Sequence, residues 1–228
     1  MRFSLVRRHF SAVSLLAALA GSSLLSAAAV AAAPSVSSKA APGPAVILVV
    51  GDSLSAEYGL KRGSGWVALL EQRLAAEKIA ARVVNASISG DTTSGGRSRL
   101  EALLSQHRPT HVVIELGAND AMRGLPLQMT QDNLTHMTQA AQQAGARVLL
   151  VGMQVPPNYG QDYARRFSEM FGQVAKGSKS ALVPFFLAGI AETANSPQWF
   201  QADRIHPKEE AQPRMLDNVW PELRKLLK

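Results

Sequence analysis

The 228-residue chain contains no cysteine and few aromatic residues, which make up 6% of the sequence. The lack of cysteine excludes a disulfide framework, a thiolate zinc site, a cysteine nucleophile and a lipidated N-terminal cysteine. Acidic residues are fewer than basic ones, 17 against 24, which gives a net charge of +7. Because the basic residues form no Lys/Arg run, nucleic-acid binding is not expected, whereas a loose association with anionic membrane surfaces is compatible with this charge.

The rest of the composition is that of an ordinary globular protein. Hydrophobic residues make up 46% and charged residues 18% of the chain, with 17 Gly and 12 Pro. These fractions argue against a disordered chain, a collagen-like repeat and a coiled coil. The length favours one domain or at most two, and it is sufficient to bury a core in a monomer without excluding a dimer.

The first 33 residues have the pattern of a secretory signal peptide. Residues 1–10 are basic, residues 12–30 are apolar, and the small alanines that follow suit a signal peptidase. An uncleaved membrane anchor is the alternative, since a stretch of this length can just span a bilayer, although its serines and glycine weaken that reading. Residues 34–45, rich in Ser, Ala and Pro, are expected to form a flexible lead-in to a domain over residues 46–228.

The predicted signal peptide implies export. Its removal would take away Arg2, Arg7 and Arg8, leaving 21 basic against 17 acidic residues and a net charge of +4. The sequence Arg7-Arg8-His9-Phe10 also resembles a twin-arginine motif, so the general secretory route and the twin-arginine route are both open. Either route leads to a periplasmic or secreted bacterial protein.

The remaining chain alternates short apolar runs with amphipathic segments. The apolar runs predict strands over residues 46–50, 82–86, 110–116, 147–153 and 182–187, the last interrupted by Pro184. Helical spacing predicts helices over residues 65–79, about 97–106, 131–144, 162–176 and about 208–227. Such an alternation indicates a doubly wound α/β fold with a parallel sheet.

Polar motifs follow the first three predicted strands. Gly51–Ser53, Ser89–Asp91 and Gly117–Asp120 come directly after them. Doubly wound sheets bind ligands at the carboxyl ends of their strands, so these motifs are expected to lie together at one edge of the sheet. The agreement between motif and topology points to a functional site there.

The residues at this edge suit acyl transfer by a serine. Ser53 follows Gly51 on a tight turn and is the candidate nucleophile, and His206 is the candidate base. Asp203, three residues before His206, is placed to accept a hydrogen bond from its Nδ1 and so orient the ring. The main-chain N–H groups of Ser53 and Gly90 and the side chain of Asn119 are candidate donors to an oxyanion.

Each of these residues also has a plainer interpretation. The Gly-Asp and Gly-Ala-Asn-Asp motifs are typical of turns, with Asn119 in the left-handed region, and a single Asp-x-x-His is weak evidence for catalysis. His107, His111 and His136 have no acid in comparable register and are expected to be surface residues.

Taken together, four ordered blocks resemble the SGNH (GDSL) hydrolases. They are Gly51-Asp52-Ser53-Leu54-Ser55, Gly90 within Ile88–Thr92, Gly117-Ala118-Asn119-Asp120, and Asp203 to His206. The resemblance runs from about residue 46 to the end of the chain. Within this family, the sequence is similar to the secreted bacterial thioesterase I/lysophospholipase/arylesterase group. This narrower similarity rests on residues 84–92, residues 115–124, Asn158-Tyr159-Gly160 and residues 205–213.

This resemblance implies a fold and a mechanism. The fold is a three-layer α/β/α sandwich around a flavodoxin-like, five-stranded parallel sheet. Ser53 would be the nucleophile, His206 the base and then the acid, and Asp203 its orienting partner, with Ser53, Gly90 and Asn119 forming the oxyanion hole. The reaction would pass through an acyl-enzyme without metal or cofactor, and Asp52 and Asp120 would support their turns.

The acyl-binding pocket is expected among the loops at the same edge. Apolar contacts would come from Met122, Leu125, Pro156 and Tyr159. Ordinary anchoring of the loops is an equally good explanation for these side chains. The substrate would be a small-molecule or lipid-like acyl ester.

Three functions remain open from the sequence. The first is an esterase for aryl and alkyl esters and acyl thioesters, including lysophospholipids. The second is a carbohydrate or peptidoglycan O-acetyl esterase of the same superfamily, which the low aromatic content disfavours. The third, a catalytically silent binding protein, is disfavoured because the candidate nucleophile, base, orienting acid and oxyanion donors are all present.

Overall fold

The computed structural model describes residues 43–193 and 196–228. The chain divides into two units, residues 1–40 and 41–228, and the described residues belong to the second. The predicted signal peptide and residues 34–42 of the predicted lead-in lie outside the described residues. Ala45, the last residue assigned to the lead-in, is the first residue of a strand.

Five parallel strands form one sheet. They are β1 (Ala45–Gly51), β2 (Ala81–Asn85), β3 (His111–Glu115), β4 (Arg147–Val151) and β5 (Ala181–Val183). Their order in the sheet is β2-β1-β3-β4-β5. This is the flavodoxin-like order, in which the chain changes direction across the sheet between β1 and β3. The predicted fold class is confirmed.

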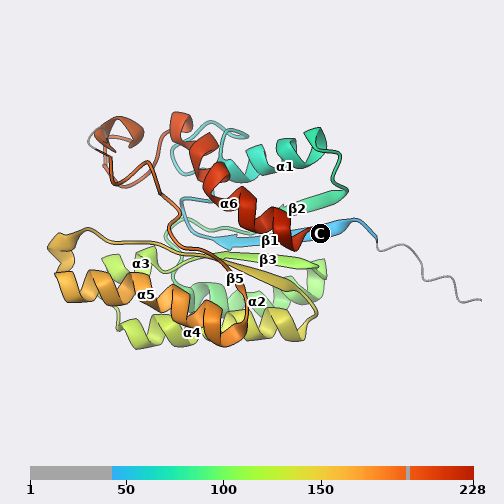
Figure 1. The fold of residues 1–228 in the computed structure, drawn as a ribbon, viewed down its shortest axis with the longest axis horizontal. Helices are drawn as coiled ribbons and strands as arrows, with labels where there is room; N and C mark the ends of the chain where they lie inside the picture. Colours follow the sequence, from blue (N-terminus) through green and yellow to red (C-terminus); the bar gives the residue numbers. More distant parts are fainter. Residues whose placement is uncertain (1–42, 194–195) are drawn as a thin grey trace, which may run out of the picture. The chain divides into compact units, whose positions relative to one another are not determined.

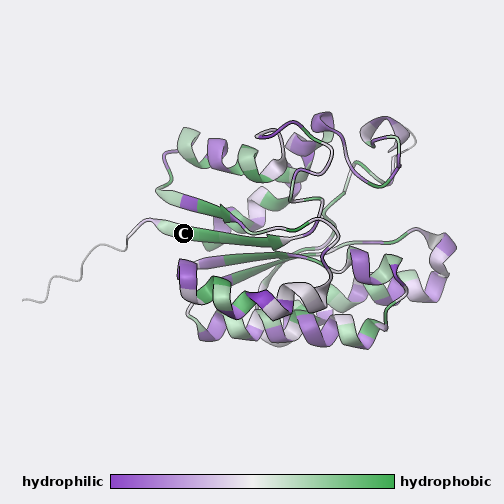
Figure 2. Cartoon of the chain, turned by 180° about the vertical axis from the view of Figure 1, so that it is seen from behind, coloured by the Kyte–Doolittle hydropathy of each residue, from purple (hydrophilic) through white to green (hydrophobic). Residues whose placement is uncertain are grey.

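The middle of the sheet is fully buried. Ile47 to Val50 of β1 have no exposed surface, and β3 and β4 are almost as apolar. Strands covered on both faces are expected to be continuous aliphatic runs, which is the pattern that the sequence carries. In Figure 2 these strands are green, whereas the helices around them carry hydrophilic residues as well.

Helices cover both faces of the sheet (Figure 1). On one face lie α1 (Trp66–Ala76) and α6 (Gln212–Leu226), which pack against each other. On the other face lie α2 (Thr93–His107), α4 (Leu127–Gln143) and α5 (Gln161–Ser178). Two short elements at the carboxyl edge are α3 (Ala118–Met122) and the 3₁₀ turn η1 (Pro157–Tyr159).

The second helix begins earlier than expected. The Gly-rich stretch before residue 97 was assigned to a loop, but α2 begins at Thr93 because the Thr92 side chain accepts a hydrogen bond from the Gly95 N–H at 3.3 Å. Gly96 faces the sheet, and a Cβ there would lie 2.3 Å from Leu116 Cδ1. The glycine therefore lets the first turn of the helix approach the sheet closely, rather than breaking the helix.

Other boundaries of strands and helices differ from the predicted ones, and each difference has a physical reason. Strand β5 ends at Val183 instead of reaching Leu187, because Pro184 has no N–H to continue the ladder. The plainer interpretation of Gly117–Asp120, a turn with Asn119 in the left-handed region, is wrong, because only Gly117 of the motif has a positive φ, 122°, and residues 118–122 form α3. The last helix begins at Gln212, after a separate 3₁₀ turn η3 (Glu209–Ala211).

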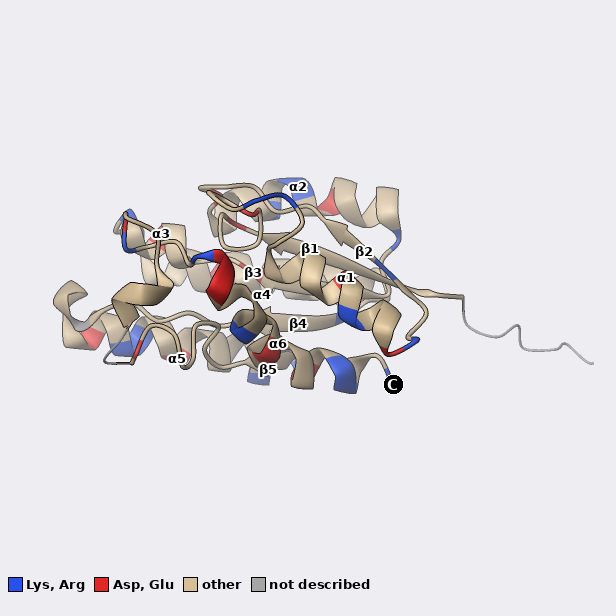
Figure 3. Ribbon diagram, turned by 90° about the horizontal axis from the view of Figure 1, so that it is seen from above, with Lys and Arg blue, Asp and Glu red and all other residues tan. Residues whose placement is uncertain are grey.

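Charges of both signs are interspersed over the helices and loops (Figure 3). Within residues 43–193 and 196–228, no helix is both long enough and apolar enough to cross a membrane.

Candidate active site

Ser53 lies directly after β1, at the point where the order of the strands reverses. The chain turns sharply there, with the Ser55 and Ala56 N–H groups donating to the Asp52 carbonyl at 3.2 and 3.0 Å. Asp52 fixes the turn further, because its Oδ1 accepts from the Leu54 N–H at 3.0 Å. The turn leaves the Ser53 side chain half-buried at the carboxyl edge of the sheet.

Three side chains form a continuous hydrogen-bonded chain at this edge. Ser53 Oγ is 2.9 Å from His206 Nε2, and His206 Nδ1 is 2.7 Å from Asp203 Oδ2. With Nδ1–H donating to Asp203, Nε2 is free to accept the serine proton. The structure therefore brings the candidate nucleophile, Ser53, to the candidate base and orienting acid, which lie 150 or more residues further along the chain.

The turn that carries Asp203 and His206 is built by the acid itself. Asp203 Oδ1 accepts from the Ile205 and His206 N–H groups at 2.9 and 3.0 Å. These bonds, the His206 N–H first among them, lower the pKa of Asp203 from 3.8 to about 2. Arg204 takes a positive φ of 59° to close the turn. The acid is thus ionised throughout the neutral range.

A further contact holds the histidine ring. The Tyr58 ring lies beside it, with the ring centroids 4.3 Å apart and the planes 38° apart. The Tyr58 carbonyl accepts from Gln201 Nε2 at 2.9 Å, which ties the loop after β1 to the loop that carries His206. Sequence reasoning missed Tyr58, because its contact with His206 joins two loops far apart in the chain.

The three candidate oxyanion donors differ in their present partners. The Ser53 and Gly90 N–H groups have no hydrogen-bond partner among the described residues. Asn119 Nδ2 donates to Asp52 Oδ2 at 3.0 Å and to the Asp91 carbonyl at 2.9 Å. To serve an oxyanion, the amide has to exchange one of these bonds for one to the substrate.

Asp52 belongs to a buried polar cluster with Glu115. Asp52 is 1% exposed and Glu115 is fully buried. Burial is the largest cause that raises the pKa of Asp52 to about 6, and burial followed by the charge of Asp52 raises the pKa of Glu115 well above its usual range. Asp52 is therefore more than a support for its turn, since it links Glu115 to Asn119.

Asp120 supports the loop after β3. Its carboxylate accepts from the Thr93 N–H at 2.8 Å, from the Thr93 hydroxyl and from Thr130 Oγ1 at 3.3 Å. These bonds join α3 to the beginning of α2 and to α4. They agree with the expected role of Asp120 as a structural residue, and they hold the neighbouring Asn119 in place.

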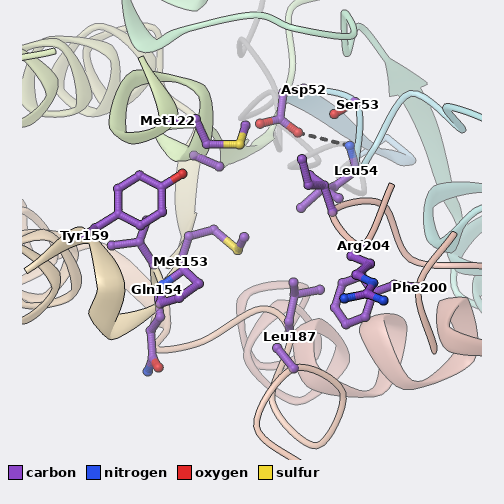
Figure 4. A pocket seen from close by; sticks show the side chains of 15 residues that line it. Asp52, Ser53, Leu54, Met122, Met153, Gln154, Tyr159, Leu187, Phe200 and Arg204 are labelled. Atoms are coloured by element: carbon purple, nitrogen blue, oxygen red, sulfur yellow. Dashed lines mark hydrogen bonds between the residues drawn. The ribbon is translucent and has the colours of Figure 1, made fainter. Parts of the chain in front are cut away.

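An apolar pocket of about 210 Å³ opens beside Ser53 (Figure 4). Met122 and Tyr159 lie on one side, and Leu54, Phe200 and Leu187 lie on the other. Of the four residues expected to contact an acyl chain, Met122, Pro156 and Tyr159 line the pocket, and Leu125 does not.

Several lining residues were missed from the sequence. They are Leu54, Met153, Leu187, Phe200 and Ile205. The rule that residues just after strands face the ligand would have found Met153, which comes two residues after β4. Phe200 and Ile205 lie near Asp203 in the sequence, in the long segment after β5, where that rule does not apply.

Among the described residues, His107, His111 and His136 take no part in the Ser53 cluster, but one prediction about them was wrong. His111 was expected at the surface and is 6% exposed, with Nε2 2.9 Å from the Leu226 carbonyl. Burial lowers the pKa of His111, whereas the hydrogen bond to the Leu226 carbonyl acts to raise it. His136 is exposed on α4, as expected, and His107 is half-buried at the end of α2. In the part of the chain that the structure describes, no three His, Asp or Glu side chains are placed to hold a metal ion.

A parallel sheet in this order, with a serine, a histidine and a carboxylate linked at its carboxyl edge, defines a serine hydrolase of the SGNH fold. Residues 49–212 match the GDSL-like lipase/acylhydrolase family, and the chain belongs to this family.

Named relatives agree with this assignment. Esterase TesA of Pseudomonas aeruginosa is 55% identical over 181 residues, which cover 79% of this chain and 89% of the relative. Thioesterase 1/protease 1/lysophospholipase L1 of Escherichia coli K12 is 41% identical, covering 79% and 84% of the two chains. The crystal structure of the psychrotrophic esterase EstA from a Pseudoalteromonas species is 42% identical with a TM-score of 0.75, covering 80% of this chain and 98% of EstA.

Proposed function

We propose that this SGNH esterase hydrolyses aryl and alkyl carboxylic esters and acyl thioesters, lysophospholipids among them, through an acyl-enzyme on Ser53. The observation that carries the proposal is the chain of hydrogen bonds from Ser53 through His206 to Asp203 beside an apolar pocket. It places a nucleophile, its base and a binding surface for an acyl chain within one site.

The proposed reaction has two halves. Ser53 Oγ attacks the acyl carbonyl while His206 Nε2 takes the hydroxyl proton, and the imidazolium then gives that proton to the leaving alcohol or thiol. Water attacks the resulting ester of Ser53, with His206 again as base, and releases the carboxylic acid. Asp203 keeps the ring in place and stabilises the imidazolium in both halves.

The oxyanion would be stabilised by the Ser53 and Gly90 N–H groups and the Asn119 amide. Support comes from the two main-chain groups, which have no partner of their own among the described residues. Preorganised donors of this kind typically contribute the largest share of acyl-transfer catalysis.

The pocket supports an acyl or aryl group rather than a sugar. Apolar side chains, among them two methionines, two leucines and one phenylalanine, form most of its walls. Such a surface gains free energy from burying an aliphatic chain and offers few polar partners to a carbohydrate. The relatives carry the names esterase, arylesterase and thioesterase/lysophospholipase, which agrees with this substrate class.

The direct test is hydrolysis of p-nitrophenyl esters of increasing acyl length, together with an acyl thioester. Replacing Ser53 by Ala is expected to abolish activity, whereas Ser105→Ala, at an exposed serine of α2, leaves it unchanged. A preference for chains longer than acetate supports the proposal. Acetate-only activity would favour an O-acetyl esterase, and activity that survives Ser53→Ala would refute the mechanism.

We also propose that residues 1–33 direct export to the periplasm or the medium, and that the exported enzyme associates loosely with membrane surfaces. Among the described residues, five large hydrophobic side chains are 41–51% exposed: Tyr58, Ile88, Met122, Tyr159 and Ile205. Each comes from the segment that follows a different strand of the sheet. The exposed apolar side chains therefore gather at the edge that carries Ser53, where a lipid-borne ester would approach.

Co-sedimentation with phosphatidylglycerol vesicles tests the association. Ile88→Ser is expected to weaken binding, because Ile88 is exposed and lies outside the pocket. Ala80→Ser, at an exposed residue of the opposite edge of the sheet, is the control and should bind as the wild type does. Equal binding of all three proteins would contradict a role for the carboxyl edge.

A further inference from the structure

Glu115, the last residue of β3, is fully buried and has no part in the reaction described above. Its Oε2 accepts from Ser55 Oγ at 2.7 Å and from the Asp52 N–H at 3.4 Å. Its Oε1 is also buried, and it has no hydrogen-bond partner among the described residues. A buried carboxyl oxygen without a partner is costly, so its presence needs an explanation.

The surrounding residues make room for this carboxyl group. Gly51 lies opposite Glu115 in the register of β1 and β3. A Cβ on Gly51 would lie 2.9 Å from Glu115 Oε2 and 2.7 Å from Ser55 Oγ, which is too close for either. Trp66 Nε1 fixes Ser55 Oγ from the other side at 3.1 Å. The carboxyl group therefore occupies a fitted site within the core.

Asp52 is the second buried acid of this cluster. Its N–H donates to Glu115 Oε2 at 3.4 Å, and Asp52 itself is 1% exposed. Two carboxylates cannot bond to each other because both only accept, so a hydrogen bond between these acids requires a proton on one of them. Burial, followed by the negative charge of Asp52, raises the pKa of Glu115 well above its usual range. Because the buried Oε1 has no donor to accept from among the described residues, the protonated form of Glu115 is the one that fits this site.

We propose that Glu115 is a protonated positioning residue, which donates a hydrogen bond to the Asp52 carboxylate and thereby fixes the direction of the Asn119 amide. Asp52 is then held by Glu115, by the Leu54 N–H at 3.0 Å and by Asn119 Nδ2 at 3.0 Å. Because Asp52 is held in this way, one N–H of Asn119 stays on Asp52, and the other can exchange its bond to the Asp91 carbonyl for one to the oxyanion. This inference rests on the proposed function, in which Asn119 is an oxyanion donor.

Two substitutions separate a neutral donor from an ionised group. Glu115→Gln keeps the shape, donates to Asp52 through its amide and accepts from Ser55, so we expect kcat within about threefold of the wild type. Glu115→Leu removes donor and acceptor. Its kcat should fall by about tenfold or more, with little change in KM, yet by less than the ~10²–10³ expected when an oxyanion donor is removed outright. Equal losses of kcat in both folded variants, or a Glu115→Leu variant with wild-type kcat, would overturn the proposal.

An infrared measurement keeps the proposal testable if Glu115→Leu does not fold. At neutral pH the difference spectrum between wild type and Glu115→Gln should contain the carbonyl band of a protonated carboxylic acid. A carboxylate band in its place would show that Glu115 is ionised and would refute the inference. This readout does not depend on turnover, and activity that survives Ser53→Ala would mark a failure of the proposed function instead.

Discussion

At the scale of single residues, Asn119 connects the structure most directly to the rate. Its amide is buried and already oriented by Asp52 and by the Asp91 carbonyl. When negative charge develops on a substrate oxygen, the bond to the Asp91 carbonyl has to be exchanged, while the bond to Asp52 keeps the amide in place, and donors held in place in this way favour strong electrostatic catalysis.

Asn119→Ala is expected to lower kcat by about 10²–10³-fold with a small change in KM, because the donor acts mainly in the transition state. Steady-state kinetics on a p-nitrophenyl ester measure this effect. Asn133→Ala is the matched control, since Asn133 is also buried but donates to Thr93 Oγ1. A similar loss of kcat in both variants would mean that the effect of Asn119 is structural.

Asp52 gives a pH dependence of stability with a defined sign. Burial raises its pKa from 3.8 to about 6, while the Leu54 N–H, the charge of His206 and the Asn119 amide lower it and Asp91 raises it. A raised pKa means that the folded state binds the proton more tightly. This contribution to the free energy of unfolding is fully present below about pH 4 and is lost as the pH rises through about 6. The change of the pKa from 3.8 to about 6 corresponds to about 3 kcal/mol.

Urea unfolding of the wild type and Asp52→Asn between pH 4 and pH 7.5 tests this dependence. The stability of the wild type relative to the variant should decline by up to about 3 kcal/mol as the pH rises through this window. Burial and the charge of Asp52 also raise the pKa of Glu115, so a titration of Glu115 in this window would change stability in the same direction. A constant difference between the two proteins would show that Asp52 does not titrate there.

At the scale of elements, the boundaries were predictable wherever one residue type controls them. The five strands were found because buried parallel strands are uninterrupted aliphatic runs, and β5 was expected to be disturbed at Pro184. The beginning of α2 was not found. Gly95 and Gly96 discourage a helix by propensity, and only the approach of α2 to Leu116 makes a glycine necessary there.

Helix α5 offers a test of the same balance between propensity and context. Gly172 lies in the middle of α5, and a Cβ there meets nothing within 4 Å. Gly172→Ala should therefore stabilise the protein by about 0.5–1 kcal/mol. Gly145 also has open space, but its φ is +85°, so Gly145→Ala should destabilise by about 1 kcal/mol. Thermal unfolding distinguishes the two, and shifts of the same sign would contradict the argument.

At the scale of the whole molecule, the sequence located Ser53, Gly90, Asn119, Asp203 and His206 because each lies in a local motif at the end of a strand or next to a turn. Glu115 and Tyr58 could not be found in this way. Their roles arise from contacts across the sheet edge, with Asp52 in one case and with the His206 ring in the other. Such contacts depend on the registers of β1 and β3 and on the closure of loops far apart in the chain.

The position of β1 in the sheet determines how much of the N-terminus can be removed. Strand β1 pairs with β2 on one side and with β3 on the other, and Ile47 and Leu48 have no exposed surface. A chain that begins at Pro34 keeps this strand and should unfold cooperatively and hydrolyse esters. A chain that begins at Val49 loses four of the five residue pairs with β2 and two of the five with β3. It also loses about 2 kcal/mol of hydrophobic free energy for each of the two side chains.

Three proteins that begin at Pro34, Gly43 and Val49 test this expectation. Circular dichroism melts and p-nitrophenyl ester hydrolysis should be the same for the first two. The third should lack a cooperative transition, because a loss of this size is a large part of the 5–15 kcal/mol that stabilises a domain. A folded, active chain from Val49 would mean that β1 contributes little to the sheet. A loss of activity between Pro34 and Gly43 would instead assign a structural role to residues 34–42.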